Sequence, residues 1–456
     1  MTCTAGRGRG RARTGIGAAA VAIALSAALA GAPAKAGAQD ADSSRRLVLG
    51  DLYRELRDAS PRAAAARALA RAVEARIASA RRPPDPELQL GFMNYALPEL
   101  EPMDPLGMTE LQLMQMVPTA GKLGLAGRAA EARSDAAAER AADIAWEVRS
   151  EGAMIFYELY AADRSLEIAR ATLRLLHDIL GTAEAMYRVG DGRQADVLRA
   201  QVEIARMTED TIRMHAMRVG MAARLDALRD RPAAGRAPDP ALPLLPASVP
   251  ALDSLLALAD AYRPMLRAGE AEVRAAGADA RLARREIWPD LRLGVAYGQR
   301  GSEMGTERMG SLMIGASVPV FARSRQLRMR EETNAMRRMA EADLAGMRAE
   351  TRGRVVAAHA ELQRARRLAA LYRNTVIPQA EATVASAHAA YRVGSVDFMT
   401  LLDDRMTVNR YRQELASLEA AEGKAWAELE MLTGRQLFDP FVVARDAAAG
   451  AAGGIR

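Results

Sequence analysis

The sequence predicts a mainly α-helical protein that also carries membrane-type β-strands and is built from two repeats. Three observations support this fold class: duplicated motifs, four segments of alternating apolar and polar residues, and very long helical runs. Of the 456 residues 50% are hydrophobic but only 4% are aromatic, because alanine supplies much of the apolar fraction. Alanine favours helix and buries little area, so closely packed long helices are expected rather than a thick core.

Residues 1–38 predict a secretory signal peptide: four arginines, an apolar run over 16–30, and Ala36-Gly37-Ala38 as the cleavage site. Removing its five positive charges from the net charge of +6 leaves about +1, which argues against a nucleic-acid partner. The only cysteine, Cys3, leaves with this segment, so no disulfide, thiolate metal site or lipidated cysteine is expected. An uncleaved anchor helix is the alternative. No later apolar run is long enough for a transmembrane helix.

Short motifs of the first half return in the second half after 201 to 204 positions. Pro86-Glu87-Leu88 returns as Pro289-Asp290-Leu291, Val117-Pro118 as Val318-Pro319, and Tyr187-Arg188-Val189-Gly190 as Tyr391-Arg392-Val393-Gly394. The shared order and nearly constant offset indicate an internal duplication. We therefore expect a first repeat over 39–231 and a second over 251–445, each with a helix, a strand pair and a long helical hairpin. A proline-rich connector at 232–250 and a disordered Ala/Gly-rich tail at 446–456 complete the chain.

Each repeat opens with a proline-containing helical stretch, over 47–80 and 252–287, and two alternating segments follow it. Their apolar positions are Leu88, Leu90 and Phe92; Leu111, Leu113 and Val117; Leu291, Leu293, Val295 and Tyr297; and Leu312, Ile314, Ala316 and Val318. Period two over about nine or ten residues fits a membrane-spanning strand with one lipid face and one wet face. An amphipathic strand of a soluble sheet is the alternative, and the long helices and secretory signal favour the membrane.

Four strands cannot close a barrel, because a spanning barrel needs about eight and lipid tolerates no open edge. Several chains must therefore share one barrel. Two chains would give eight strands and three would give twelve, and a pore wide enough for solutes favours the larger number.

Long helical runs occupy 121–188 and 323–392, and Pro378 is expected to interrupt the second. Each would reach on the order of 100 Å if continuous, which suits a tube better than a globule. The helices after the turns, read in heptads from Val197 and Leu401, are apolar at eight of ten a and d positions.

The two-fold repeat, the paired strands and the Tyr-x-Val-Gly motif followed by a leucine-containing helix resemble the TolC family of outer-membrane efflux channels. The resemblance covers essentially the whole mature chain. It implies a homotrimer in the outer membrane, with a 12-stranded β-barrel of four strands per chain continuous with a long α-helical barrel in the periplasm. It also implies docking to a periplasmic adaptor and an inner-membrane pump, so that small solutes or metal ions leave passively. A periplasmic adaptor and a soluble coiled-coil scaffold without a pore are the alternatives.

The segment 117–124 looks like the strand-to-helix junction of the heavy-metal branch of this family, in which Pro-x-x-Gly-Lys is common. The alternative is that Pro118 and Gly121 only end the strand and start the helix. Eight methionines flank the strands and could suit soft copper or silver ions, but adaptable packing is the favoured interpretation. They are Met93, Met103, Met108, Met114, Met116, Met304, Met309 and Met313.

The resemblance also assigns residues to the periplasmic tips. The turns at Val189-Gly190 and Val393-Gly394 would contact the adaptor, and glycine permits the left-handed backbone that reverses one helix into the next. A plain turn is the alternative.

By family position, Asp403 would form a carboxylate ring at the pore constriction and attract cations. The second ring position falls at Thr400, which puts a double ring in doubt. Asp196 and Tyr391 match residues that hold the tips closed. The arginine expected beside them falls at Val396, so that closure should be weaker or differently built. For each acid the alternative is a solvated helix residue.

No catalytic, metal or cofactor site stands out in the sequence. The histidines at 177, 215, 359 and 388 lack metal-ligand spacing, and no phosphate-binding loop or nucleophile elbow is present. An enzyme is therefore the least favoured class.

Overall fold

The computed structural model describes residues 46–96, 98, 101–103, 107–302, 305–393 and 395–443. The predicted signal peptide, the whole predicted tail at 446–456, Gly394 and Met304 lie outside the described residues.

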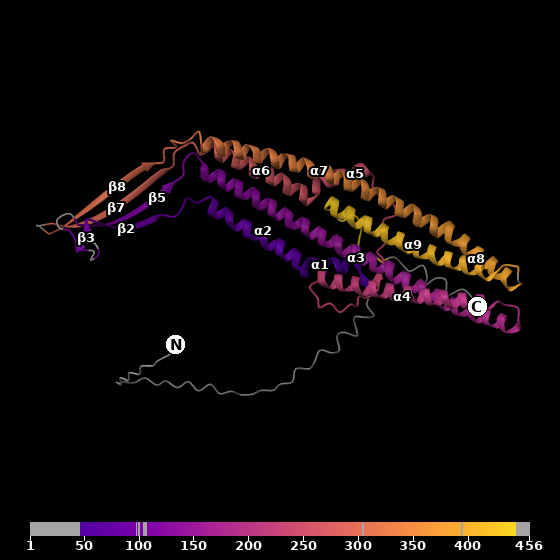
Figure 1. Ribbon diagram of the computed structural model, residues 1–456. Helices are drawn as coiled ribbons and strands as arrows, with labels where there is room; N and C mark the ends of the chain where they lie inside the picture. Colours follow the sequence, from indigo (N-terminus) through magenta and orange to yellow (C-terminus); the bar gives the residue numbers. More distant parts are fainter. Residues whose placement is uncertain are drawn as a thin grey trace, which may run out of the picture. The chain divides into compact units, whose positions relative to one another are not determined.

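Two series of elements follow each other in the same order, except that β3 and β4 occur only in the first and η1 only in the second (Figure 1). The first consists of β1 (Leu47–Val48), α1 (Leu49–Ala59), α2 (Pro61–Ala80), β2 (Glu87–Met93), β3 (Tyr95–Ala96), β4 (Glu101–Pro102), β5 (Met108–Val117), α3 (Lys122–Val189) and α4 (Gln194–Leu228). The second consists of β6 (Pro240–Ala241), α5 (Leu252–Tyr262), α6 (Pro264–Arg285), β7 (Leu291–Ser302), β8 (Gly305–Ala316), α7 (Gln326–Leu371), the π-helix η1 (Tyr372–Val376), α8 (Ile377–Arg392) and α9 (Phe398–Thr433). The mainly helical class with four longer strands is confirmed.

The four predicted strands form one antiparallel sheet in the order β2-β5-β7-β8 (Figure 1). Leu111 lies opposite Leu90 on β2 and Tyr297 on β7, and Val295 lies opposite Leu113 and Leu312. Because side chains alternate across a strand, this register gathers the apolar positions on one face of the sheet. These side chains are exposed, with Leu312 at 73%. Within the described residues, β2 and β8 each pair along one edge only.

The other face of the sheet carries polar residues, glycines and most of the strand methionines. The amide of Gln112 on β5 donates to the sulfur of Met114 at 2.8 Å and to that of Met313 at 3.6 Å. Both methionine side chains lie over Gly294, which leaves room for them. This geometry agrees with methionine as adaptable packing.

The helix α3 is continuous over 68 residues and packs against α2, α4, α6 and α9. Alanines fill much of these contacts, since Ala129, Ala132 and Ala136 on α3 and Ala271 and Ala275 on α6 are buried. This agrees with the expectation of close helix packing.

The interruption expected at Pro378 takes the form of the π-helical turn η1 between α7 and α8. Proline lacks the N–H of the usual i→i−4 bond, and a wider turn accommodates this without ending the helix.

The largest core cluster joins α1, α3 and α9, where Leu52, Phe156, Tyr157 and Trp426 are fully buried. Gly423 on α9 faces the ring of Tyr157 so closely that an added Cβ would lie 2.1 Å from it. The connector contributes β6, which pairs in parallel with β1. Among the described residues, no helix has both the length and the hydropathy needed to cross a membrane.

Candidate functional site

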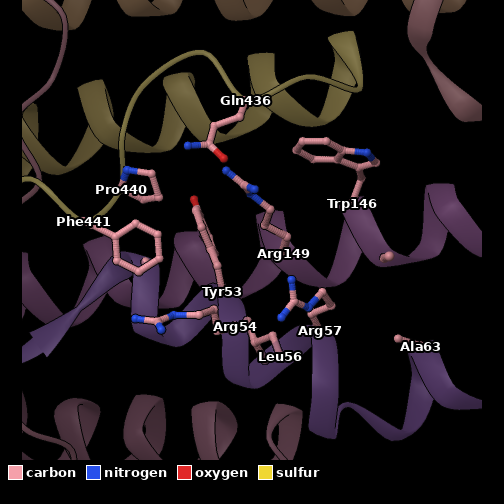
Figure 2. A pocket seen from close by; sticks show the side chains of 12 residues that line it. Tyr53, Arg54, Leu56, Arg57, Ala63, Trp146, Arg149, Gln436, Pro440 and Phe441 are labelled. Carbon is pink, nitrogen blue, oxygen red and sulfur yellow. The ribbon is translucent and has the colours of Figure 1, made fainter.

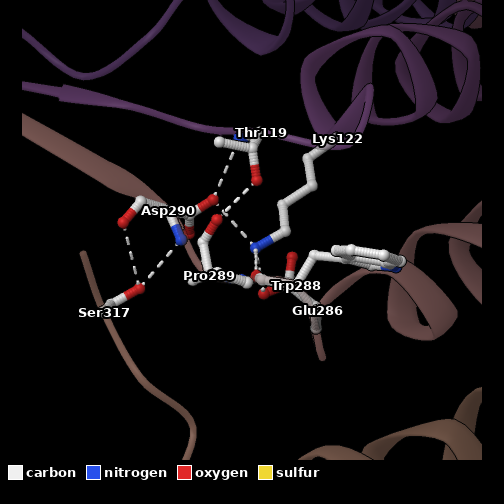
Figure 3. A network of polar contacts seen from close by, with 7 residues as sticks. All are labelled: Thr119, Lys122, Glu286, Trp288, Pro289, Asp290 and Ser317. Carbon is white, nitrogen blue, oxygen red and sulfur yellow. Dashed lines mark hydrogen bonds and ion pairs between the residues drawn. The ribbon is translucent and has the colours of Figure 1, made fainter.

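The first strand–helix junction contains a buried lysine (Figure 3). Gly121 adopts a left-handed backbone with φ of 72°, and α3 begins at Lys122 directly after it. Lys122 is only 5% exposed. Its Nζ donates to the carbonyl oxygen of Trp288 and to Oδ1 of Asp290, both at 2.9 Å, and lies 3.5 Å from Oε2 of Glu286. A buried cation needs such partners, because removing it from water is costly.

Asp290 connects three segments at this junction (Figure 3). Its Oδ1 also accepts from the backbone N–H of Thr119 at 3.1 Å, and the Thr119 hydroxyl donates to the carbonyl oxygen of Pro289. Its own N–H donates to the Ser317 hydroxyl at 2.9 Å, while the Ser317 N–H donates to the Asp290 carbonyl at 2.9 Å. The end of β5, the start of β7 and the end of β8 are therefore held together by one residue. Pro118, Gly121 and Lys122 therefore have a structural role at this junction. This role does not depend on whether their pattern is that of the heavy-metal branch.

Both predicted tip turns expose valine. Gly190 has φ of 86°, and the N–H groups of Asp191 and Gly192 both donate to the carbonyl of Met186 at 3.0 Å, which closes the end of α3. Val189 and Val393 are 72% and 78% exposed. Exposed apolar side chains on a turn suit contact with another protein. The adaptor-contacting role of both turns stays a prediction.

Asp196 and Tyr391, predicted to close the tip, lie near each other. Burial raises the pKa of Tyr391, and the Asp196 carboxylate raises it further. Tyr391 also packs edge-on against Phe398, with 6.0 Å between ring centroids.

The two helical hairpins share an apolar cluster near this pair. Phe398 and Leu402 from α9 are buried against α3 and α4, together with Leu176, Ile179 and Met207. Movement of one hairpin tip away from the other would therefore expose apolar surface.

Thr400 and Asp403 differ in their surroundings. The Thr400 N–H donates to Oδ1 of Asp397 at 3.3 Å, and the Thr400 hydroxyl donates to the same oxygen. These bonds hold the pKa of Asp397 below its usual value, and the positive charge of Arg193 contributes. Both side chains are exposed, but Thr400 takes part in the N-terminal cap of α9 and Asp403 does not. The role of both at a constriction stays a prediction.

Asp397 was not singled out from the sequence, although its signal was present. An aspartate followed three residues later by a polar residue, just before an apolar helix, is typical of a helix start.

A cavity of about 250 Å³ lies between α1, α3 and the segment after α9 (Figure 2). Arg149 crosses it, with its guanidinium 3.9 Å from the Tyr53 ring centroid and 2.8 Å from Oε2 of Glu430. Burial raises the pKa of Glu430, and Arg149 opposes that shift. These contacts tie three helices together, which gives the residues a structural role.

Among the described residues, no group of three or more His, Cys, Asp or Glu side chains is placed to hold a metal ion. His359 interacts with the carbonyl of Pro250, with Nε2 3.2 Å from that oxygen. His177 contacts the carbonyl of Leu173 on its own helix.

A family model described as outer membrane efflux protein matches residues 52–229 and 255–435 of the chain. A curated relative, the pyoverdine export outer membrane protein OpmQ of Pseudomonas putida, is 26% identical over 174 residues. That alignment covers 36% of this chain and 36% of the relative, so the match spans about a third of the relative's length.

Solved structures share the fold over most of the chain. The outer-membrane channel OprN has a TM-score of 0.72 at 20% identity and covers 87% of this chain and 94% of its own. VceC of Vibrio cholerae has a TM-score of 0.73 at 17% identity and covers 86% and 97%. The MtrE channel of Neisseria gonorrhoeae has a TM-score of 0.70 at 15% identity and covers 85% and 89%.

Proposed function

The chain belongs to the outer membrane efflux protein family, and on that premise we propose that three copies build one exit duct through the outer membrane. The observation that carries this proposal is the four-stranded sheet, which has one apolar exposed face and pairs along only one edge of β2 and of β8 within the described residues. Unpaired strand edges are not tolerated in lipid, so neighbouring copies must supply the missing partners. Three chains give the 12 strands of a barrel wide enough for solutes.

The helices would continue this barrel into the periplasm. One long hairpin comes from α3 and α4 and the other from α7, η1, α8 and α9. Two such hairpins from each of three chains can enclose a tube, whereas a periplasmic adaptor is expected to have a single hairpin. Buried alanines and small apolar clusters are suited to this side-by-side packing.

We propose that this duct conducts its substrates passively and catalyses no reaction. The sequence carries no phosphate-binding loop, so the energy would come from an inner-membrane pump linked through an adaptor that docks at the turns around Val189 and Val393. No cofactor and no enzymatic step are proposed. The exported class is small solutes or metal ions, and the printed name of the Pseudomonas relative, a pyoverdine exporter, fits the first of these.

Control of conduction is assigned to the tips. Asp196 and Tyr391 would keep the periplasmic end narrow in the resting duct, and three copies of Asp403 would attract cations at the constriction. Docking of the adaptor would separate the hairpin tips and open the end.

Membrane fractionation followed by mass measurement in detergent tests the proposal. We expect the protein in the outer-membrane fraction, a stable trimer in detergent, and single-channel currents in planar bilayers. A monomer that stays in aqueous buffer without detergent would reject the duct and favour the coiled-coil scaffold. The resistance profile of a deletion strain across metals, dyes and antibiotics would then identify the exported compound.

A further inference from the structure

We propose that Arg323 of one protomer pairs with Glu87 of the next, where β8 and β2 meet with Ile314 opposite Phe92. The partner is a second copy of this chain. The inference rests on the proposed function, because it requires that copies share one sheet. The inference adds the contacts between neighbouring copies: one ion pair, and the register in which β8 of one copy pairs with β2 of the next.

The internal repeat identifies the two residues. The segment from Val117 to Lys122 aligns without a gap on the segment from Val318 to Arg323, at an offset of 201. The motif Pro289-Asp290 aligns on Pro86-Glu87 at an offset of 203. Arg323 is thus the equivalent of Lys122, and Glu87 is the equivalent of Asp290. Lys122 and Arg323 are both basic, and Asp290 and Glu87 are both acidic.

The equivalent residues differ in exposure. Lys122 is 5% exposed and Asp290 is half-buried, because the two halves of the chain cover each other at the first junction. Arg323 and Glu87 are both exposed, and neither takes part in an ion pair within the described residues. The second junction therefore has the same sequence pattern as the first, but its charged residues are not buried by another part of the described chain.

Apolar side chains show the same difference. Val117 and Ala120 are half-buried at the first junction, whereas their equivalents Val318 and Phe321 are 74% and 75% exposed. A large exposed aromatic beside an unpaired strand edge marks a surface that another chain covers. Glu87, at the start of β2, is the acidic group that the repeat places opposite this surface.

The register follows from the same offsets. Within the chain, Val117 on β5 lies opposite Leu291 on β7, and Leu113 lies opposite Val295. Shifted to the equivalent strands, Val318 would lie opposite Leu88 of the next protomer, and Ile314 opposite Phe92.

This register also places the apolar residues of the two strands on one face of the sheet. The exposed apolar residues of β8 and β2, including Ile314 and Phe92, fall on the same face of the joined sheet. A slip by one residue would place them on opposite faces, which a sheet with one lipid face does not tolerate.

Cross-linking tests the register. The only native cysteine, Cys3, lies in the predicted signal peptide, so a chain with Ile314→Cys and Phe92→Cys carries one designed pair per interface. Facing positions on adjacent strands lie about 5 Å apart at Cβ, within reach of a short thiol-to-thiol reagent. We expect linked trimers on denaturing gels and a peptide pair joining positions 314 and 92 by mass spectrometry. The matched control, Ile314→Cys with Gly91→Cys, points its second thiol to the opposite face and should link several-fold less.

Charge reversal tests the ion pair. Arg323→Glu alone and Glu87→Arg alone should each raise the monomer fraction of the detergent-solubilised trimer at least about tenfold, and the double variant should restore most of the trimer. Arg325→Glu is the matched control, because Arg325 is an exposed arginine two residues away that has no equivalent role in the repeat. It should leave the trimer fraction unchanged.

The outcomes separate this inference from the proposed function. A stable trimer that cross-links equally well through Gly91→Cys, or in which the double charge reversal fails to rescue, would overturn the register and ion pair while leaving the duct in place. Absence of any trimer for the unaltered protein, together with solubility without detergent, would instead overturn the duct itself.

Discussion

The two strand–helix junctions of this protein carry equivalent sequences in different surroundings. At the first, Lys122 is buried against the carboxylate of Asp290, which belongs to the other half of the chain. At the second, Arg323 is exposed beside the edge of β8 that has no partner strand in the part of the chain that the structure describes. Duplication produced two similar surfaces, and the chain can cover only one of them by itself. A residue that is exposed although its equivalent in the other repeat is buried therefore marks a surface where a second copy of the chain can bind.

The helical hairpins of the two halves differ as well. The helix α3 runs without interruption to the turn at Gly190, while its counterpart contains the π-helical turn η1 and Pro378. After the turns, α4 begins at Gln194 and its N-cap residue Arg193 makes no side-chain cap hydrogen bond, whereas Asp397 caps α9. The second hairpin therefore combines a helical arm interrupted by η1 with a helix, α9, whose start has a side-chain cap.

The largest expected effect comes from Lys122→Met, which would leave the half-buried Asp290 carboxylate without its cation. Breaking such a pair costs about 3–5 kcal/mol, so the protomer itself should lose stability in chemical unfolding of the detergent-solubilised protein. Arg323→Met should lower the trimer fraction but leave the unfolding of the protomer unchanged. Equal effects of both substitutions on protomer unfolding would contradict the view that the first junction stabilises the protomer and the second stabilises the trimer.

The next effect concerns closure at the tips. Tyr391→Phe removes the hydroxyl near Asp196, and Asp196→Ala removes the carboxylate. If the two groups form a hydrogen bond at the closed tip, its loss costs about 1 kcal/mol, so the open fraction of single-channel recordings should rise about five-fold with either change. The double variant should open little more than each single variant if the two groups act together. Tyr187→Phe is the matched control, since Tyr187 holds the equivalent place in the first hairpin and is exposed.

A smaller effect is expected at the constriction. Asp403→Ala should reduce the cation-to-anion permeability ratio about two-fold or more, because the proposed ring of three carboxylates would be removed, while the trimer stays intact. Reversal potentials measured across a salt gradient in a planar bilayer check this. Asp404→Ala is the control on the same helix, and an unchanged reversal potential for Asp403→Ala would exclude Asp403 from the pore.

Local patterns in the sequence predict the elements well. The alternation at Leu88, Leu90 and Phe92 matches β2, since period two reflects the strand geometry directly. Proline predicts where a helix is disturbed but not how, so the turn before Pro378 was expected as an interruption and is a π-helical turn. The short strands β3 and β4 lie between the first two predicted strands, in a segment for which the sequence predicts no element.

Contacts between distant residues are harder to predict. Lys122 and Asp290 lie 168 residues apart, and they meet only because β5 pairs with β7. No strand order follows from the sequence, which therefore identifies Lys122 only as part of a junction motif. The pairing of β1 with β6 was missed for the same reason, because prolines indicate where a helix stops and not where the chain goes.

The most local effect concerns the N-terminal caps of α4 and α9. Asp397→Ala should make amide exchange in the first turn of α9 about five-fold faster, the usual effect of losing one cap, with no change in the first turn of α4. Since the pKa of Asp397 is lowered in the folded chain, the cap persists above the ordinary aspartate pKa and is lost as pH falls through the lowered value. Arg193→Asp would supply α4 with the same type of cap, and its first turn should then exchange more slowly. If Arg193→Asp instead destabilises both turns, the attraction between Arg193 and Asp397 matters more than either cap, and hydrogen exchange of the unaltered protein at raised salt should reproduce that loss.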